Sequence, residues 1–383
     1  MTSGAASHCC MSALEARLDW RSAGASHSDR LIVDTRACQA DGRWMRAAEA
    51  LCGGRQLVEL DATPWLQPRG LDPARIPAQR WRLPGAPVAG RFYPRVAFPD
   101  LAQGPRDLRP VRLLEVAEDT LRVDANHALA GREITFSLRS HAGEAAPGTR
   151  LQELFDGPGL QAPPADTAAA YLGLDGFGRR DETEDGLFYG RPRLVHHLDA
   201  VCRREIAGLY ARFLRPGLRV LDFMSSWESH LPDEPSDLHV AGLGMNRDEL
   251  MANPRLSERV VKDLNQRADL PWGDAVFDLV LCTASVEYLL RPLEVLREAR
   301  RVLRPGGVCV LAFSDRWFPD KAIRVWSELH PFERLGMVLG LLAAAGFGDA
   351  HTQTLRGLKR PEDDKYAAQR AQADPLFAAW GVA

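Results

Sequence analysis

Residues that could bind a ligand or react with it follow short apolar segments in the C-terminal half of the chain. Asp222 is followed by hydroxyl and indole groups at 225–227, and Asn246, Asp263 and the 283–288 segment follow later apolar runs. In an open α/β sheet the ligand sits beyond the carboxyl ends of the strands. If these apolar runs are parallel strands, we expect the residues after them to line one groove.

Three residues near this expected groove are candidate general bases, because a carboxylate or an imidazole can take a proton from a reacting group. They are Glu228, His230 and Glu287. Each has a structural alternative: Glu228 could pair with an arginine, His230 could cap the following helix, and Glu287 could lie on a solvated face. We interpret His196 and His197 as a helix-surface pair, and we predict no metal site.

The elements that must position these residues are predicted by alternating strands and helices over 188–358. Strands are expected at 219–223, 238–243, 260–263, 277–282 and 308–313, and helices at 193–214, 247–252, 292–303, 321–329 and 331–345. Near-continuous apolar strands such as 277–282 are typical of a parallel sheet covered on both faces. We therefore predict a doubly wound α/β fold for this half of the chain.

The same half resembles the class I S-adenosylmethionine-dependent methyltransferases, in particular the type 11 group. Family-like runs occur in order at 270–278, 289–292 and 298–307, where the last reads EARRVLRPGG. The resemblance implies a Rossmann-like domain, S-adenosylmethionine as the cofactor and methyl transfer as the activity. The cofactor-binding residues that it implies are Asp222, Met224, Ser225, Ser226, Trp227, Asn246, Asp263 and Leu264.

The cofactor loop departs from the family pattern. The positions of the three loop glycines are occupied here by Met224, Ser226 and Glu228. The acid that usually binds the ribose corresponds to Gly244, so the resemblance leaves Asn246 as a substitute. It places Asp263 beside the adenine amino group, with Leu264 packed next to it.

Two interpretations of the variant loop stay open. In the first, the hydroxyls of Ser225 and Ser226 replace backbone contacts to the cofactor, and Trp227 faces the sulfonium through a cation–π attraction. In the second, Trp227 fills the groove and the domain is a non-catalytic scaffold.

The N-terminal 140 residues are predicted to be β-rich, with strands at 14–20, 56–60, 111–116, 120–124 and 133–139 and a helix at 44–51. The run VDANHALAG at 123–131 and the alternating strand after it resemble SlyD-like FKBP-type peptidyl-prolyl cis-trans isomerases. The resemblance implies an α+β FKBP-like domain over 10–140 with an inserted, chain-binding flap at about 71–125. It also implies a prolyl pocket formed by Trp44, Met45, Trp65 and Phe136. The alternative is that these four are core residues of a degenerate fold.

We therefore predict two domains joined by a linker at 141–187, with a C-terminal tail at 359–383. Three functional hypotheses follow. The first joins an isomerase or chaperone module to a methyltransferase, the second is a non-catalytic polypeptide-binding protein, and the third is a small-molecule methyltransferase with an inert N-terminal domain. The expected partner is accordingly a polypeptide client or a small-molecule methyl acceptor.

Composition excludes other classes of function. The net charge is −3 and no basic stripe is visible, so we expect no nucleic-acid partner. No run approaches the roughly 20 apolar residues of a membrane span, and the N-terminus lacks the features of a secretory signal. We expect a cytoplasmic protein. The seven cysteines contain no C-x-x-C pair, so we predict neither a zinc site nor a disulfide framework.

Overall fold

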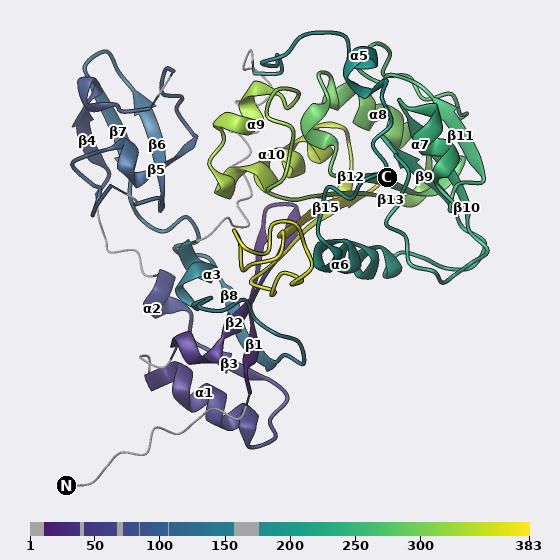
Figure 1. Cartoon of the computed structure of the whole chain (residues 1–383). Coiled ribbons are helices and arrows are strands. Elements are labelled where there is room, and N and C mark those ends of the chain that lie inside the picture. The colour runs from purple at the N-terminus through teal and green to yellow at the C-terminus, as the bar shows by residue number, and fades with distance from the viewer. Residues whose placement is uncertain (1–10, 39–41, 67–71, 84, 106, 157–175) are drawn as a thin grey trace, which may run out of the picture.

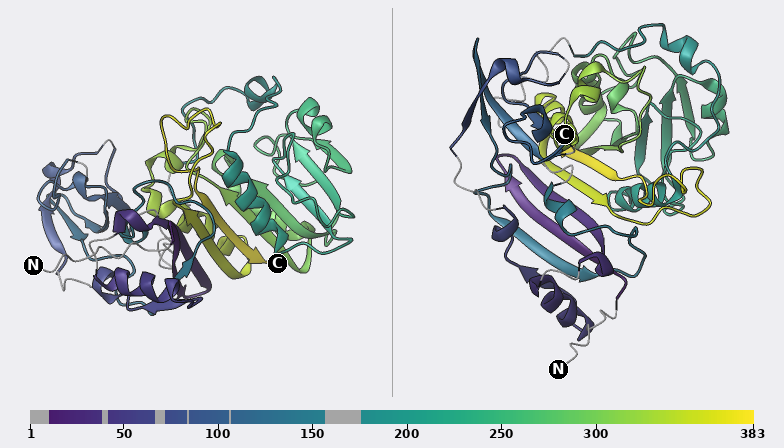
Figure 2. Two further views of the ribbon diagram at one scale, coloured as in Figure 1. Left: turned by 60° about the horizontal axis from the view of Figure 1, so that its bottom comes forward. Right: turned by 60° about the vertical axis from the view of Figure 1, so that its left-hand side comes forward.

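The computed structural model describes residues 11–38, 42–66, 72–83, 85–105, 107–156 and 176–383. In this part of the chain, one mixed sheet of eleven strands crosses the molecule in the order β11-β10-β9-β12-β13-β15-β14-β2-β1-β8-β3. A separate four-stranded sheet stands beside it (Figures 1 and 2). The two halves predicted from the sequence thus share a single sheet.

The C-terminal half of this sheet is an α/β layer. Its parallel strands are β9 (Arg219–Phe223), β10 (His239–Gly244), β11 (Glu258–Val261), β12 (Phe277–Thr283) and β13 (Leu303–Phe313). Its helices are α6 (Ala200–Ala211), α7 (Arg247–Ala252), α8 (Pro292–Val302), α9 (Arg324–Glu328) and α10 (Pro331–Ala344). Val220 packs with the α6 and α7 side chains, and Leu221 faces the opposite core with α8 and α10. The strand is therefore buried on both faces, and the prediction of a doubly wound, Rossmann-like fold is confirmed.

The predicted C-terminal tail is wrong. Within 359–383, β15 (Leu376–Val382) lies between β13 and β14 (Gly348–Arg356) and is antiparallel to both. Its sequence, LFAAWGV, is almost wholly buried, as expected for a central strand. Residues 376–382 are therefore part of the core.

The N-terminal half continues the same sheet. It consists of β1 (Ala13–Ser22), β2 (Ala25–Asp34), β3 (Val58–Leu60) and β8 (Ile134–Ser140), with the helices α1 (Gly42–Cys52) and α2 (Thr63–Leu66). β14 pairs in parallel with β2 and so joins the two halves. The sequence did not predict β2 or β14, whereas β1, β3, β8 and α1 lie within a few residues of their predicted positions.

The smaller sheet is inserted between α2 and β8. It contains β4 (Ala74–Pro77), β5 (Phe92–Pro94), β6 (Pro110–Val116) and β7 (Thr120–Asp124), and it has its own apolar core. It occupies the range predicted for the inserted flap, and it docks on the start of α10. Glu333 accepts a hydrogen bond from the Phe92 amide at 2.8 Å and pairs with buried Arg91 at 3.4 Å. His330 donates to the Leu108 carbonyl at 2.8 Å.

The junction between β2 and β14 contains a buried ion pair. Arg356 donates to Asp29 at 2.8 Å, and the Thr354 hydroxyl donates to the same carboxylate. We expect Thr354→Val to lower the free energy of unfolding by about 1–2 kcal/mol, because a buried carboxylate loses a hydrogen bond. Urea denaturation measures the change, and Thr120→Val at an exposed site on β7 is the control. An unchanged unfolding midpoint would show that this bond adds nothing to the junction.

The cysteines agree only partly with the sequence prediction. Cys202, Cys282 and Cys309 are buried free thiols, but Cys52 forms a disulfide, which the spacing of the cysteines did not predict. Among the described residues, no helix is both long enough and apolar enough to cross a membrane.

Candidate functional site

A cavity of about 230 Å³ lies at the carboxyl ends of β9, β10 and β12. All eight predicted cofactor residues line it: Asp222, Met224, Ser225, Ser226, Trp227, Asn246, Asp263 and Leu264. The parallel strands cause this convergence, since their ends meet at one edge of the sheet. The cavity therefore lies where the strand-end argument places a ligand.

The loop after β9 is held by side chains rather than by glycines. Met224 has a φ of 56°, which an L-residue adopts at a cost of about 1 kcal/mol. The Ser225 amide donates to the Leu243 carbonyl at 2.8 Å, and its hydroxyl donates to Asp222 at 2.6 Å. The Ser226 hydroxyl donates to Glu249 at 2.6 Å. Both serine hydroxyls thus stabilise the loop and donate their hydrogens within it rather than to a cofactor.

Close packing explains why no acid stands at the end of β10. A Cβ atom at Gly244 would overlap the carbonyl oxygen of Ser225. The loop after β9 crosses directly over this position, so only glycine fits there.

Gly244→Asp restores the acid of the family pattern, yet we expect it to weaken cofactor binding. The new side chain must push the Ser225 backbone aside, at a cost of about 1–2 kcal/mol. Calorimetric titration with S-adenosylhomocysteine and a thermal melt measure the two effects. Gly273→Asp is the control, because a Cβ there meets nothing within 4 Å. Tighter binding by the Gly244 variant would contradict this account of the loop.

Asn246 is not available as a ribose ligand. Its side-chain oxygen caps α7 by accepting from the amides of Asp248 and Glu249 at 3.0 and 3.1 Å. Its amide group donates to the carbonyls of Tyr189 and Gly190 at 2.9 and 3.2 Å. The residue therefore anchors the chain that covers the cavity, which corrects the predicted role.

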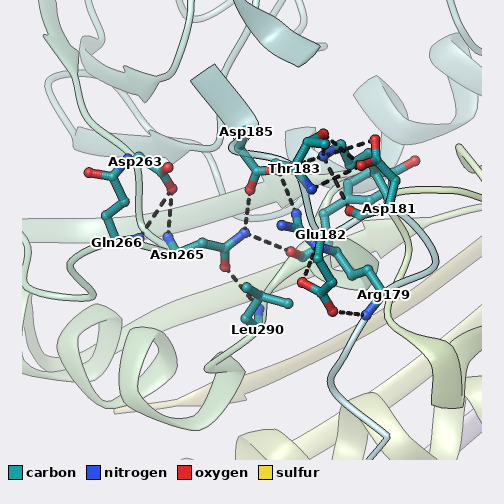
Figure 3. A network of polar contacts seen from close by, with 11 residues as sticks. Arg179, Asp181, Glu182, Thr183, Asp185, Asp263, Asn265, Gln266 and Leu290 are labelled. Carbon is teal, nitrogen blue, oxygen red and sulfur yellow. Dashed lines mark hydrogen bonds and ion pairs between the residues drawn. The ribbon is translucent and has the colours of Figure 1, made fainter. Parts of the chain in front are cut away.

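Asp263 keeps one oxygen for a ligand. Its Oδ1 atom accepts from the amides of Asn265 and Gln266 at 2.8 and 3.3 Å, which fixes the turn after β11 (Figure 3). No hydrogen bond to its Oδ2 atom is found among the described residues. The geometry is compatible with the predicted contact to an adenine amino group.

Residues 176–199, which we call the strap, lie across the carboxyl edge of the sheet. The sequence placed part of this segment in a linker and part in a helix beginning at 193, but only α5 (Asp185–Tyr189) is helical before α6 begins at Ala200. Asn265 donates to Asp185 at 2.9 Å and accepts from the Leu290 amide at 2.8 Å (Figure 3). Buried Lys321 donates to the Thr183 carbonyl at 2.7 Å. The strap is therefore a fixed wall of the cavity, and reading it as a linker was wrong.

Trp227 lies in the cavity wall beside the strap. Its indole N–H donates to the Val195 carbonyl at 3.3 Å, and its ring lies 4.6 Å from that of His196. Because the cavity remains beside it, the structure does not show the filled groove that the scaffold interpretation requires.

The three candidate bases have different surroundings. Glu228 pairs with Arg203 at 3.1 Å and with His196 at 2.9 Å, as its structural alternative proposed. His230 lines the cavity, but burial lowers its pKa to about 4. Glu287 is fully buried outside the cavity lining, so both its role as a base and its alternative on a solvated face are wrong. None of the three is a well-placed strong base.

The four residues of the predicted prolyl pocket pack into a core. Trp44 and Phe136 are buried, and Met45 packs against the same cluster. The Trp65 ring lies 5.4 Å from Phe136 and stacks at 5.2 Å on Phe155. Phe155 belongs to α3 (Gln152–Asp156), within the predicted linker. The segment expected to connect two domains thus supplies a ring that packs against these aromatics.

Part of the C-terminal half is similar to known methyltransferases. Residues 236–311 match the family described as "Methyltransferase domain". The ubiquinone/menaquinone biosynthesis C-methyltransferase UbiE of Laribacter hongkongensis is 28% identical over 34% of this chain and 56% of its own length. UbiE of Roseobacter denitrificans is 33% identical over 25% of this chain and 38% of its own length. The 27-O-demethylrifamycin SV methyltransferase of Amycolatopsis mediterranei is 35% identical over 19% of this chain and 29% of its own length.

The chain thus spans little more than half of the length of the Laribacter enzyme and less than half of the length of the other two. The predictions of a methyltransferase domain and of S-adenosylmethionine as its cofactor are supported. The matched family lies wholly C-terminal to the FKBP-like region and gives that resemblance no support. Among the described residues, no group of three or more histidine, cysteine or acidic side chains could hold a metal ion.

Proposed function

We propose that the C-terminal half transfers a methyl group from S-adenosylmethionine to a small-molecule acceptor. The observation that carries this proposal is the cavity at the strand ends of a methyltransferase-like domain. Small-molecule acceptors are also the kind of substrate that the relatives' names describe. These names favour the hypothesis of a small-molecule methyltransferase over that of a polypeptide client.

The residues present fit the cofactor. Asp222 is buried, and its partners among the described residues are the hydroxyls of Ser225 and Ser229, with no cation beside it. An ammonium group of the cofactor would supply the missing positive charge. Asp263 has an oxygen for the adenine amino group, and Leu264 offers an apolar contact beside it.

The protein contributes mainly positioning. When bound, S-adenosylmethionine supplies a methyl group that its sulfonium has already activated. Asp222 and Asp263 hold the two ends of the cofactor, and Trp227 and Tyr288 form part of the wall. Alignment of two reactants in one cavity accounts for a large part of such a rate enhancement. Since none of the predicted bases is well placed, we propose that the site depends on this alignment rather than on a strong base.

Titration calorimetry with S-adenosylmethionine and S-adenosylhomocysteine tests the proposal. We expect micromolar binding by the full chain and at least tenfold weaker binding by Asp263→Ala. Asp274→Ala removes an acid whose side chain is 80% exposed and lies outside the cavity lining, and it should bind normally. Absence of binding at millimolar ligand would rule out the proposed function.

We do not extend the proposal to prolyl isomerisation. A proline ring entering between Trp65 and Phe136 would have to displace Phe155, which packs against both. The inserted sheet is also docked on α10 through Arg91 and Glu333. The isomerase and client-binding roles therefore stay predictions from the resemblance alone.

A further inference from the structure

Arg193 presents an unpaired charge to the cavity. Its backbone amide donates to Glu249 at 2.7 Å, which fixes this part of the strap. Its guanidinium lies 4.3 Å from the centre of the Phe188 ring and 5.6 Å from that of Phe318. Among the described residues, this guanidinium forms no hydrogen bond and no ion pair. Aromatic faces hold it in place but do not neutralise it.

Other positive groups stand on the same side of the cavity. Arg316, on the loop after β13, also lines the cavity wall and pairs with Asp374 at 4.0 Å. The pKa of His197 is lowered first by burial and then by the charges of Lys365 and Arg193, against a raising effect of Glu249, and Arg316 adds a smaller lowering.

Glu249 contacts the Arg193 backbone, but it forms no ion pair with the Arg193 guanidinium. Both oxygens of Glu249 are already engaged, one by the Arg193 amide and the other by the Ser226 hydroxyl. The Arg193 guanidinium is therefore free to pair with an anion in the cavity.

The walls on this side are flat and aromatic. Tyr288, Trp317 and Phe318 line the cavity close to the positive groups. Trp317 is held by the guanidinium of Arg334, which lies 4.4 Å from its ring centre. Planar rings prefer offset or edge contacts with such walls, at centroid separations of about 4.5–7 Å. A flat ligand fits them better than a bulky aliphatic one.

We propose that the methyl acceptor is a planar aromatic acid whose carboxylate pairs with Arg193 while its ring lies against Phe318 and Trp317. A guanidinium matches a carboxylate with two parallel hydrogen bonds. The proposal rests on the proposed methyl transfer, because it assigns the substrate class of the same cavity.

The carboxylate is an anchor and is not consumed in the reaction. An electron pair on another acceptor atom forms the bond to the methyl carbon, and the electrons of the carbon–sulfur bond stay on sulfur. The proton displaced from the acceptor atom passes to water. Products are the methylated acid and S-adenosylhomocysteine, so atoms and charge balance.

The test is a titration of the full chain, saturated with S-adenosylhomocysteine, with benzoate and its neutral analogue benzamide. We expect benzoate to bind, and to bind at least tenfold more weakly to Arg193→Gln. Arg193→Lys should recover part of the affinity, because a point charge lacks the two-pronged geometry. Arg191→Gln removes an exposed arginine of the same strap and should leave benzoate binding unchanged. Benzamide should bind poorly to every variant.

Three results would overturn the proposal. They are equal benzoate affinity in wild type and Arg193→Gln, no benzoate binding at millimolar concentration, or loss of S-adenosylhomocysteine affinity in the variant. The last would assign the guanidinium to the cofactor's own carboxylate. Titration of benzoate without S-adenosylhomocysteine separates the two proposals. Arg193-dependent benzoate binding supports the anion site even if the cofactor fails to bind.

Discussion

Glu287→Gln is expected to stabilise the protein by about 4 kcal/mol at pH 8 and to change its stability little near pH 5. Glu287 is fully buried, and neither carboxyl oxygen has a hydrogen-bond partner among the described residues. Burial therefore raises the pKa of this carboxyl to about 8. Glutamine has almost the same shape but carries no charge that must be buried.

The sign of the pH effect follows from the proton balance. Between the ordinary pKa of 4.5 and the folded value of about 8, the folded chain keeps the Glu287 proton and the unfolded chain has lost it. Stability of the wild type therefore falls as pH rises through this window and levels off above it. The glutamine variant lacks this contribution, so the two curves diverge with increasing pH.

Urea denaturation at pH 5, 7 and 8.5 measures this divergence. Glu118→Gln, at an exposed turn, is the matched control and should show no gain that grows with pH. An equal gain at all three pH values would mean that the Glu287 carboxyl does not titrate within this range.

The part of the site that the sequence predicted depends on fold geometry. Apolar runs such as 219–223 and 277–282 identify parallel strands, and parallel strands bring their carboxyl ends to one edge. The cavity lining at Asp222, Asn246 and Asp263 follows from that rule without any knowledge of side-chain contacts. Position in the chain was sufficient to place these residues around the cavity.

Individual roles were less predictable because they depend on hydrogen-bond partners far away in the sequence. Asn246 has the right chemistry for a ribose, but its groups are used by α7 and by the backbone of Tyr189. Ser225 and Ser226 are engaged by Asp222 and Glu249 in the same way. No local pattern reports such competition.

The strap and β15 were missed for a related reason. Polar residues such as Thr183 and Asp185 are typical of loops, and the strap becomes a wall through distant partners such as the buried Lys321. The apolar run of β15 is visible at 376–382, but its insertion between β13 and β14 depends on long-range pairing. Phe155 packs against the predicted prolyl pocket through the same kind of distant contact.

Raising the pH from 6 to 8 is expected to tighten S-adenosylhomocysteine binding about tenfold, through ionisation of Asp222. Burial raises the pKa of this carboxyl to about 7, against weaker lowering by the Ser225 and Ser229 hydroxyls. The ionised form attracts the cofactor's ammonium group, so the bound state favours loss of the proton. A carboxylate that is 9% ionised at pH 6 and 91% ionised at pH 8 gives roughly this factor of ten for a pKa of about 7.

Asp222→Asn should remove the pH dependence and weaken binding at pH 8 by about 10- to 150-fold, since a hydrogen bond to a charged group contributes about 1.5–3 kcal/mol. 5′-Methylthioadenosine lacks the amino-acid portion, so its affinity should not vary with pH in either protein.

Without ligand, the same raised pKa makes the wild type less stable as pH rises from 3.8 to about 7. Cofactor affinity and intrinsic stability therefore change in opposite directions over the upper part of this window. An affinity of the wild type for S-adenosylhomocysteine that is flat from pH 6 to 8 would mean that Asp222 does not contact the ammonium group. An affinity that rises with pH while the stability of the unliganded protein falls would assign the contact to this carboxylate.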